Sequence, residues 1–351
     1  MSVPTHATNG MCRIRQSRPY VAQPRRNARR STSLDGFATQ EVTVRRAAVL
    51  GIALLTLVAL FTPLTVSAEA AEDDYPVPYD FLLSAVQGGL TQDLPGANDW
   101  SCTPSRQHPR PVVLVHGTFA NSNDNWQTYA PLLANEGYCV FALNYGANPA
   151  YPGSDYVGGL LPMEDGAAQL KDFVSRVRLA TGAKKVDLIG HSQGTLMPSY
   201  YVKFLGGASS VNHYISLAPL WHGTNVAQPA KVFAAIFGRE DATPFCQACG
   251  QFPPGSEFIS KVRAGGVEAD GVKYTNIVTV YDELVVPYSS GIEPGMRNIV
   301  LQNVCPQDGS EHGQLAASPN AARIVLNTLD PATAQPVRCR TVTGLGTAPI
   351  L

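Results

Sequence analysis

Short apolar, β-branched runs alternate with longer stretches of helical spacing through most of this chain, and no other feature restricts its fold as much. The apolar runs lie at residues 111–117, 139–144, 186–189, 213–217, 276–281 and 298–301. The helical stretches lie at 125–136, 164–181, 193–205 and 319–329. Strands that are apolar throughout and alternate with helices form a parallel sheet that is covered on both faces. We therefore expect one α/β domain over residues 111–351, with a compact, mostly parallel sheet of about six strands.

Two long segments, 146–162 and 221–263, interrupt this alternation. Loops longer than about 12 to 15 residues are uncommon unless they are functional, and in α/β proteins ligands bind beyond the carboxyl ends of the strands. The second segment contains "PAKVFAAIFG", an apolar stretch with no obvious place in the sheet. It is either a packing helix or a wall that faces the substrate, so we expect a cap- or lid-like insertion at about 221–263.

The first 68 residues differ from the rest of the chain. They carry nine Lys and Arg against two acidic residues, and they end in the apolar run "AAVLGIALLTLVALF" followed by "TPLTVSA". This order is typical of a secretory signal, with cleavage after Ala68 or Ala70. The alternative is a permanent membrane anchor, because the run approaches the roughly 20 residues that span a bilayer. We expect a secreted, extracellular protein whose residues 69–110, rich in Pro, Gly and Asp, form an N-terminal arm.

Charge and composition exclude some partners. Without the leader, the chain has 17 Lys and Arg against 25 Asp and Glu, a formal net charge of −8. An acidic chain without a basic run is a poor nucleic-acid binder. No pattern demands a metal ion or an organic cofactor, and none implies a stable protein partner, so we expect none of these.

Six of the seven cysteines follow the leader. An even number of cysteines in an oxidising compartment favours disulfides, here three. Cys246 and Cys249, in C-Q-A-C, could instead form half of a metal site or a redox pair. The metal site needs a second pair of ligands and the redox pair needs a thioredoxin-like context, and the sequence offers neither. A small loop closed by a disulfide is therefore favoured.

The segment "VDLIGHSQGTL", residues 186–196, places G-x-S-x-G between an expected strand and an expected helix. In this context the serine sits on a tight turn, and the flanking glycines relieve crowding. The N-terminus of the following helix offers backbone N–H groups and a partial positive charge where an oxyanion would form. We predict that Ser192 is a nucleophile.

A serine hydroxyl needs a base, and the base needs an acid that orients it. The histidines that follow the serine are His213, His222 and His312. On such a sheet the expected order is serine, acid, histidine, and the first two histidines leave little room for an acid before them. His312, just beyond the last expected strand, is therefore the predicted base.

Asp282 is the predicted acid, because it falls at the carboxyl end of the expected strand at 276–281, on the same edge of the sheet as the serine. Glu283 would point the other way if the strand continued its alternation. Asp308 and Glu311 are nearer to the predicted base in sequence, and we expect them to be solvated loop charges.

The oxyanion hole should combine the backbone N–H of Gln193, the residue after the nucleophile, with one from the loop after the first expected strand. That second donor would be Thr118. His116 precedes the serine, so we interpret it as a structural histidine that shapes the glycine turn.

Four separated motifs, "PVVLVHGTFANSNDNWQTYAPLLANEGY", "IGHSQGTL", "YDELVVPY" and "EHGQL", resemble those of secreted actinobacterial triacylglycerol lipases of the α/β-hydrolase fold. More distantly, they are similar to Candida antarctica lipase B. The resemblance covers nearly all of residues 95–340. It implies the same catalytic triad and the same oxyanion donors, namely Ser192, Asp282 and His312 with Thr118 and Gln193.

The resemblance also implies a disulfide pattern. Lipase B has disulfides at positions that resemble two pairs of this chain, which leaves a third pair: Cys102 with Cys139, Cys305 with Cys339, and then Cys246 with Cys249. One motif departs from the fungal enzyme, which carries T-W-S-Q-G where this chain has G-H-S-Q-G. A tryptophan-shaped alcohol pocket is therefore not implied here.

Together these features predict a secreted serine hydrolase that cleaves carboxylic esters of lipids, a triacylglycerol lipase acting at an oil–water interface. The alternatives are a short-chain or sterol esterase, an extracellular acyltransferase, and a secreted binding protein that keeps the fold without catalysis. A binding protein would most simply have lost one of the three catalytic candidates, and all three are present.

Overall fold

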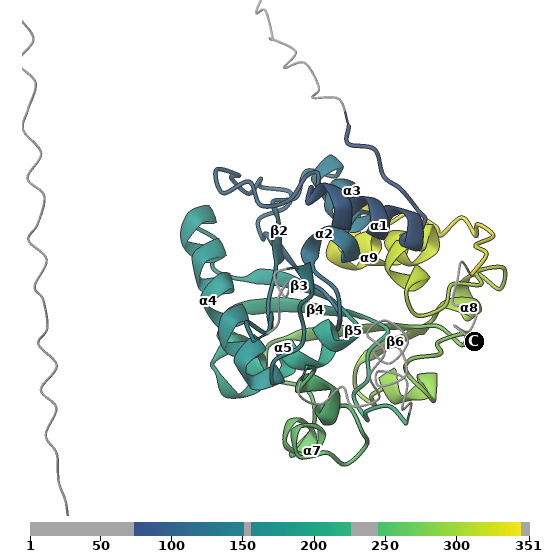
Figure 1. Cartoon of the computed structure of the whole chain (residues 1–351). Helices are drawn as coiled ribbons and strands as arrows, with labels where there is room; N and C mark the ends of the chain where they lie inside the picture. Colours follow the sequence, from purple (N-terminus) through teal and green to yellow (C-terminus); the bar gives the residue numbers. More distant parts are fainter. Residues whose placement is uncertain (1–73, 151–155, 226–244, 345–351) are drawn as a thin grey trace, which may run out of the picture. The chain divides into compact units, whose positions relative to one another are not determined.

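A single parallel sheet organises the part of the chain that the computed structural model describes, residues 74–150, 156–225 and 245–344 (Figure 1). Its six strands lie in the order β2-β1-β3-β4-β5-β6. They are β1 (Val112–Val115), β2 (Val140–Leu143), β3 (Val186–His191), β4 (Val211–Leu217), β5 (Lys273–Val278) and β6 (Arg297–Val300). The α/β fold predicted from the alternation of apolar runs and helices is confirmed.

The strand order reverses beside β1, which pairs with β2 on one side and with β3 on the other. From β1 the chain passes first to β2 and then crosses to β3, from which it continues to β6. In open α/β sheets the crevice at such a reversal, beyond the carboxyl ends of the strands, is where ligands bind. The register pairs Val115 with Gly190. This places the loop after β1 beside the G-x-S-x-G turn.

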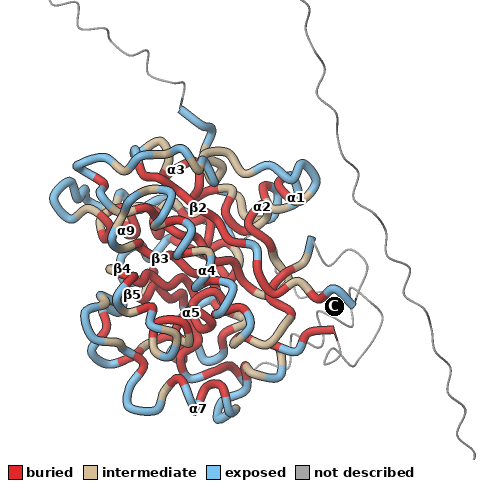
Figure 2. The backbone as a smooth tube through the Cα atoms, turned by 90° about the vertical axis from the view of Figure 1, so that its left-hand side faces the viewer, coloured by how far each residue is buried: buried red, intermediate tan, exposed pale blue. Residues whose placement is uncertain are grey.

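Helices cover both faces of the sheet (Figure 1). Alternate residues of β1 belong to different buried clusters: Val113 and Val115 pack on one face, Val112 and Leu114 on the other. The first face carries α4 (Met163–Thr181), α5 (Gln193–Phe204) and α7 (Glu257–Arg263). The second carries α3 (Tyr129–Asn135) and α9 (Pro319–Leu329). Figure 2 shows the strands as a buried layer through the middle of the molecule.

Three further α-helices lie within the described residues. They are α1 (Phe81–Thr91), α2 (Ser122–Asn125) and α8 (Leu301–Val304). The helix expected at 125–136 is divided into α2 and α3, and β5 begins and ends three residues earlier than expected. The helix expected at 319–329 has these bounds in the structure.

All three expected disulfides are present, joining Cys102 to Cys139, Cys246 to Cys249, and Cys305 to Cys339. The first fastens the segment before β1 to the start of β2. Within that segment, α1 packs beside the loop after β6, where the backbone N–H of Phe81 donates to Oε1 of Gln314 at 3.0 Å.

Part of the expected insertion is also visible. Its last third contains α7, whose Phe258, Ile259 and Val262 are buried in the same core as α5. The apolar stretch at 229–238 lies outside the described residues, as does the leader at 1–68. No helix in the described segments is long and apolar enough to cross a membrane.

Candidate active site

Ser192 stands at the turn between β3 and α5, in a backbone conformation that few side chains adopt. Its φ is 56° and its ψ is −124°, a strained region that persists only where the surroundings enforce it. The flanking glycines are required by space. A Cβ on Gly190 would lie 1.9 Å from the carbonyl oxygen of Gly194, and a Cβ on Gly194 would lie 2.0 Å from that of Val115. The turn therefore lifts the serine out of the sheet, where it remains partly exposed.

Asp282 and His312 form a buried hydrogen-bonded pair. Nδ1 of His312 lies 2.9 and 3.0 Å from the two carboxylate oxygens of Asp282. The carboxylate also accepts the backbone N–H of Leu284 at 3.0 Å and of Val285 at 2.7 Å, which fixes its orientation. Since Nδ1 donates to the carboxylate, Nε2 carries the lone pair that a general base needs.

The charges around His312 favour its protonated form. Burial, the largest single effect, lowers the pKa of this imidazole, but Asp282, Glu283 and Glu311 together outweigh burial and raise the pKa above its ordinary value. A base with a raised pKa takes a proton more readily, which suits the removal of a proton from a serine hydroxyl.

The predicted acid, Asp282, lies in a loop and not at a strand end. Because β5 ends at Val278, Asp282 lies beyond it, and the alternation rule that turned Glu283 away does not apply. The expectation for Glu283 is therefore wrong: its Oε2 accepts the backbone N–H of His312 at 3.2 Å.

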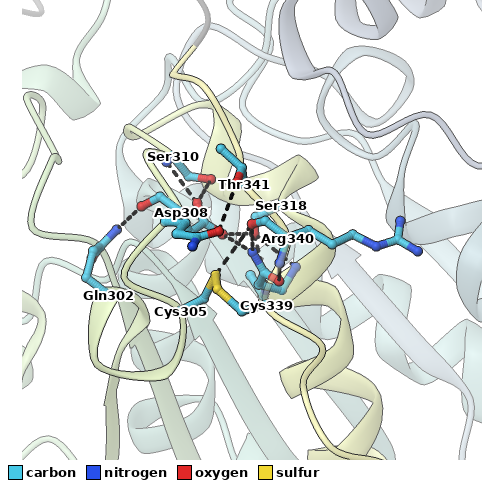
Figure 3. The surroundings of a disulfide bond; sticks show 11 residues. Gln302, Cys305, Asp308, Ser310, Ser318, Cys339, Arg340 and Thr341 are labelled. Atoms are coloured by element: carbon cyan, nitrogen blue, oxygen red, sulfur yellow. Dashed lines mark hydrogen bonds between the residues drawn. A yellow bond between two sulfur atoms is a disulfide. The ribbon is translucent and has the colours of Figure 1, made fainter.

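The expectation that Asp308 and Glu311 are solvated is also wrong, because both carboxylates are buried. Asp308 accepts hydrogen bonds from Ser310, from Ser318 at 2.6 Å and from Asn320 at 2.8 Å (Figure 3). Ser318 precedes α9 and Asn320 lies in its first turn, so the carboxylate ties the loop after β6 to that helix. Glu311 accepts two backbone N–H groups within its own turn, from residues 313 and 314 at 2.8 and 2.7 Å.

A disulfide reinforces the same loop. Cys305, which follows α8, is bonded to Cys339 (Figure 3). The backbone carbonyl oxygen of the neighbouring Arg340 accepts a hydrogen bond from the side-chain amide of Asn320 at 2.8 Å. The backbone N–H of Gly309 donates to the carbonyl oxygen of Val342 at 2.8 Å. The loop that carries His312 is therefore held on two sides.

The two predicted oxyanion donors lie together. Oγ1 of Thr118, in the loop after β1, donates to Oε1 of Gln193 at 2.6 Å. Gln193 is the first residue of α5, and the first N–H groups of a helix have no intrahelical acceptor. Gly159 packs so closely against both residues that it has no room for a side chain. A Cβ there would lie 3.0 Å from Cα of Thr118 and 2.9 Å from Oε1 of Gln193.

The other histidines considered above, His116, His213 and His222, make their hydrogen bonds and ion pairs with groups other than Asp282. His116 is buried against the ring of Tyr145, and Nδ1 lies 2.8 Å from the carbonyl oxygen of Gly117. Burial lowers the pKa of His116 to about 4, so this histidine is neutral and structural, as expected. His213 contacts the hydroxyl of a threonine on β5 at 3.1 Å, and His222 pairs with Glu293 at 3.0 Å.

Sequence reasoning missed two contributors, Asn125 and His191. Nε2 of His191 lies 2.9 Å from the carbonyl oxygen of His312, and Nδ1 lies 3.1 Å from Oδ1 of Asn125. The same Oδ1 accepts the backbone N–H of Gly117 at 3.0 Å. For His191, the position within G-x-S-x-G was the only available signal; for Asn125 there was none.

These contacts bring the loop of His312 against the residue that precedes Ser192. No hydrogen bond between Oγ of Ser192 and the ring of His312 occurs in the described structure, and catalytic hydrogen bonds are often long in the absence of substrate. The described residues also contain no cluster of three His, Cys, Asp or Glu that could hold a metal ion. The chemistry that the arrangement supports is acyl transfer through serine.

Comparison with curated proteins finds lipases. A stretch of 95 residues is 38% identical to the triacylglycerol lipase of Pseudarthrobacter phenanthrenivorans, covering 26% of this chain and 27% of that protein. A match of the same length and identity links it to the triacylglycerol lipase of Burkholderia plantarii, covering 26% of this chain and 24% of that one. The chain thus matches about a quarter of the length of each of these relatives.

Among solved structures, the chain is similar to Aspergillus fumigatus lipase B, with a TM-score of 0.50, 18% sequence identity, and coverage of 70% of this chain and 56% of that one. At this identity the likeness concerns the fold, which is that of the α/β hydrolases. The family described as lipase (class 2) matches residues 109–324, which include Ser192, Asp282 and His312. The chain therefore belongs to the class 2 lipase family.

Proposed function

We propose that this protein is a serine hydrolase that cleaves the carboxylic esters of lipids, with triacylglycerols as the substrate class. The observation that carries the proposal is the buried Asp282–His312 pair, held against a strained serine turn in a chain of the class 2 lipase family.

In the first half of the proposed reaction, Nε2 of His312 takes the proton of Ser192 as Oγ attacks the ester carbonyl carbon. The negative charge that develops on the carbonyl oxygen is held by the backbone N–H groups of Thr118 and Gln193. The C–O bond to the alcohol then breaks, and the alcohol leaves with the proton from His312.

In the second half, a water molecule attacks the acyl-serine and gives a proton to His312. Collapse of the tetrahedral adduct breaks the bond to Oγ of Ser192, which recovers its proton as the carboxylic acid leaves. Asp282 keeps the proton of His312 on Nδ1 throughout and stabilises the imidazolium that forms in each half.

Initial rates on p-nitrophenyl esters of two to sixteen carbons, measured for the wild type beside Ser192→Ala, test the proposal. We expect a serine-dependent rate that favours medium or long acyl chains and rises above the solubility limit of the substrate. A preference for butyrate with no gain at an interface would instead support a short-chain esterase. A serine-dependent rate that requires an added alcohol would support an acyltransferase. Faster serine-dependent hydrolysis of sterol esters than of the p-nitrophenyl esters would support a sterol esterase.

A fluorophosphonate probe separates all of these from a non-catalytic binding protein. The probe should label Ser192 in the wild type and leave Ser192→Ala unlabelled. Absence of label in folded wild-type protein would mean that the fold is used for binding alone.

We also propose that the protein is exported and loses its leader after Ala68 or Ala70. Three disulfides support maturation in an oxidising compartment. Sequencing the N-terminus of protein recovered from the culture medium tests this proposal. An intact leader on membrane-bound protein would instead indicate that the leader is a permanent membrane anchor.

A further inference from the structure

Three anchors hold His312, and they come from different parts of the chain. Asp282 binds its ring, Glu283 accepts its backbone N–H, and His191 lies against its carbonyl oxygen. The first two anchors belong to the loop after β5. Only His191 belongs to the segment that carries the nucleophile, since Ser192 is the next residue.

The contact continues beyond His191 to the oxyanion loop. Nδ1 of His191 lies 3.1 Å from the amide oxygen of Asn125, which accepts the backbone N–H of Gly117 at 3.0 Å. Gly117 immediately precedes Thr118, the proposed oxyanion donor. One polar chain therefore runs from the oxyanion loop, through the residue before the nucleophile, to the backbone of the base.

The ring of His191 has little freedom to leave this position. The residue is 4% exposed, and its ring meets those of Phe81, Trp126 and His312 at centroid distances of 6.1, 6.5 and 5.0 Å. Close packing of this kind holds a side chain in one rotamer. The 2.9 Å contact with His312 is therefore a fixed distance between two loops.

The protonation of His191 follows from its partners. Burial, with the nearby His312 adding to its effect, lowers the pKa of His191 to about 3, so the ring carries one N–H at neutral pH. A carbonyl oxygen can only accept, which places that N–H on Nε2. Nδ1 is then an acceptor opposite the amide of Asn125, whose Nδ2 has no other partner among the described side chains. The amide keeps its orientation because Oδ1 accepts the backbone N–H of Gly117, so its contact with Nδ1 is not a hydrogen bond, and the inference rests on the bond from Nε2 to the carbonyl oxygen of His312.

We propose that His191 is a positioning residue whose Nε2–H holds the carbonyl oxygen of His312 and so fixes the base relative to Ser192. The inference rests on the proposed function, in which His312 takes the proton of the serine. Without this hydrogen bond, the remaining hydrogen bonds of His312 itself in the described structure lead only to Asp282 and Glu283, and its distance from the nucleophile is no longer set by the serine turn.

A near-isosteric pair of substitutions tests the hydrogen bond. In His191→Gln the terminal amide can donate to the carbonyl oxygen, whereas His191→Met fills similar space without a donor. We expect His191→Gln to stay within tenfold of the wild-type kcat on a p-nitrophenyl ester, and His191→Met to fall a further 10- to 100-fold. KM should stay within about twofold, because the ester does not contact the buried ring.

His213 supplies the matched control, since it is a partly buried histidine on the neighbouring strand β4 whose ring makes one hydrogen bond. His213→Gln and His213→Met should show equal kcat values. Equal kcat values for His191→Gln and His191→Met, both folded by circular dichroism, would overturn the positioning role. If the wild-type rate does not depend on Ser192, the proposed function fails instead.

The wild-type protein offers a second measurement that needs no substitution. In ¹⁵N-histidine-labelled protein, the nitrogen resonances should show His191 as the Nε2–H tautomer with a slowly exchanging proton. The Nδ1–H tautomer would place the lone pair of Nε2 against the carbonyl oxygen and would overturn the inference even if both variants fail to fold.

Discussion

Replacing Asp282 by Asn would test the proposed acid directly. The Asp282 carboxylate meets the ring of His312 at 2.9 and 3.0 Å, and the side chains of the pair are 2% and 5% exposed. In the transition state the ring becomes an imidazolium. Two unit charges about 3 Å apart attract each other by roughly 5 kcal/mol at an effective dielectric constant of 20. Because 1.36 kcal/mol corresponds to a factor of ten in rate, we expect kcat/KM to fall by about 10⁴-fold.

The loss should come from the chemistry and not from unfolding. Asn keeps an oxygen that can accept the backbone N–H groups of Leu284 and Val285, so the melting temperature should change by only a few degrees. The amide can also turn its NH₂ group toward Nδ1, which would force the proton of His312 onto Nε2 and remove the base. The assay is stopped-flow acylation with p-nitrophenyl octanoate, and fluorophosphonate labelling should slow by a similar factor.

Glu283→Gln is the matched control, because this neighbouring carboxylate touches the backbone N–H of His312 and not its ring. We expect it to lower kcat/KM by less than tenfold. If Asp282→Asn keeps activity within tenfold of the wild type while Glu283→Gln loses several powers of ten, the acid is Glu283 and the electrostatic reasoning above is refuted.

Three further outcomes follow from the site. The proposed base must be neutral to act, so kcat/KM should fall as the pH drops through the raised pKa of His312; a profile flat down to pH 4 would contradict this. Gly190→Ala should abolish soluble expression or activity, because its Cβ would lie 1.9 Å from a carbonyl oxygen. Its control is Gly89→Ala in helix α1, where nothing lies within 4 Å of the added Cβ. Chemical denaturation should show that Gly89→Ala raises the free energy of unfolding by about 0.5–1 kcal/mol. Thr118→Val removes the 2.6 Å bond to Gln193 but leaves both backbone donors, so kcat should fall by about five- to tenfold with KM unchanged, reflecting one neutral hydrogen bond of about 1 kcal/mol.

The sheet could be predicted because its strands are buried on both faces and read as apolar runs. The expected strand at 276–281 shows the limit of that signal. Its last residues are apolar, yet the pairing with β6 ends at Val278 and Val300, and the chain then turns into the acid loop. An apolar residue in such a loop has the same sequence pattern as one in a strand, so the orientation of Glu283 could not be obtained from alternation.

The triad candidates could be chosen because order along the chain and position at strand ends restrict them strongly. The hydrogen bonds around these three residues could not be predicted from the sequence. Asp308 is buried because Ser318 and Asn320 approach it from α9, and those contacts depend on how the last helix packs. Asn125 was expected to begin the helix at 125–136, whereas it ends α2 and turns its side chain toward His191. Burial of polar groups depends on partners distant in sequence, which a single sequence does not reveal.

The separation of base and nucleophile along the chain affects when the site can first exist during synthesis. His191 and His312 are 121 residues apart, and domains generally fold as units. A nascent chain that ends before β6 contains the serine turn and both proposed oxyanion donors but lacks the proposed base. Docking of the final loop against α1, through Phe81 and Gln314, then joins the two ends of the described domain. If the proposed function holds, the serine turn therefore acquires its proposed base only after the loop of His312 has docked.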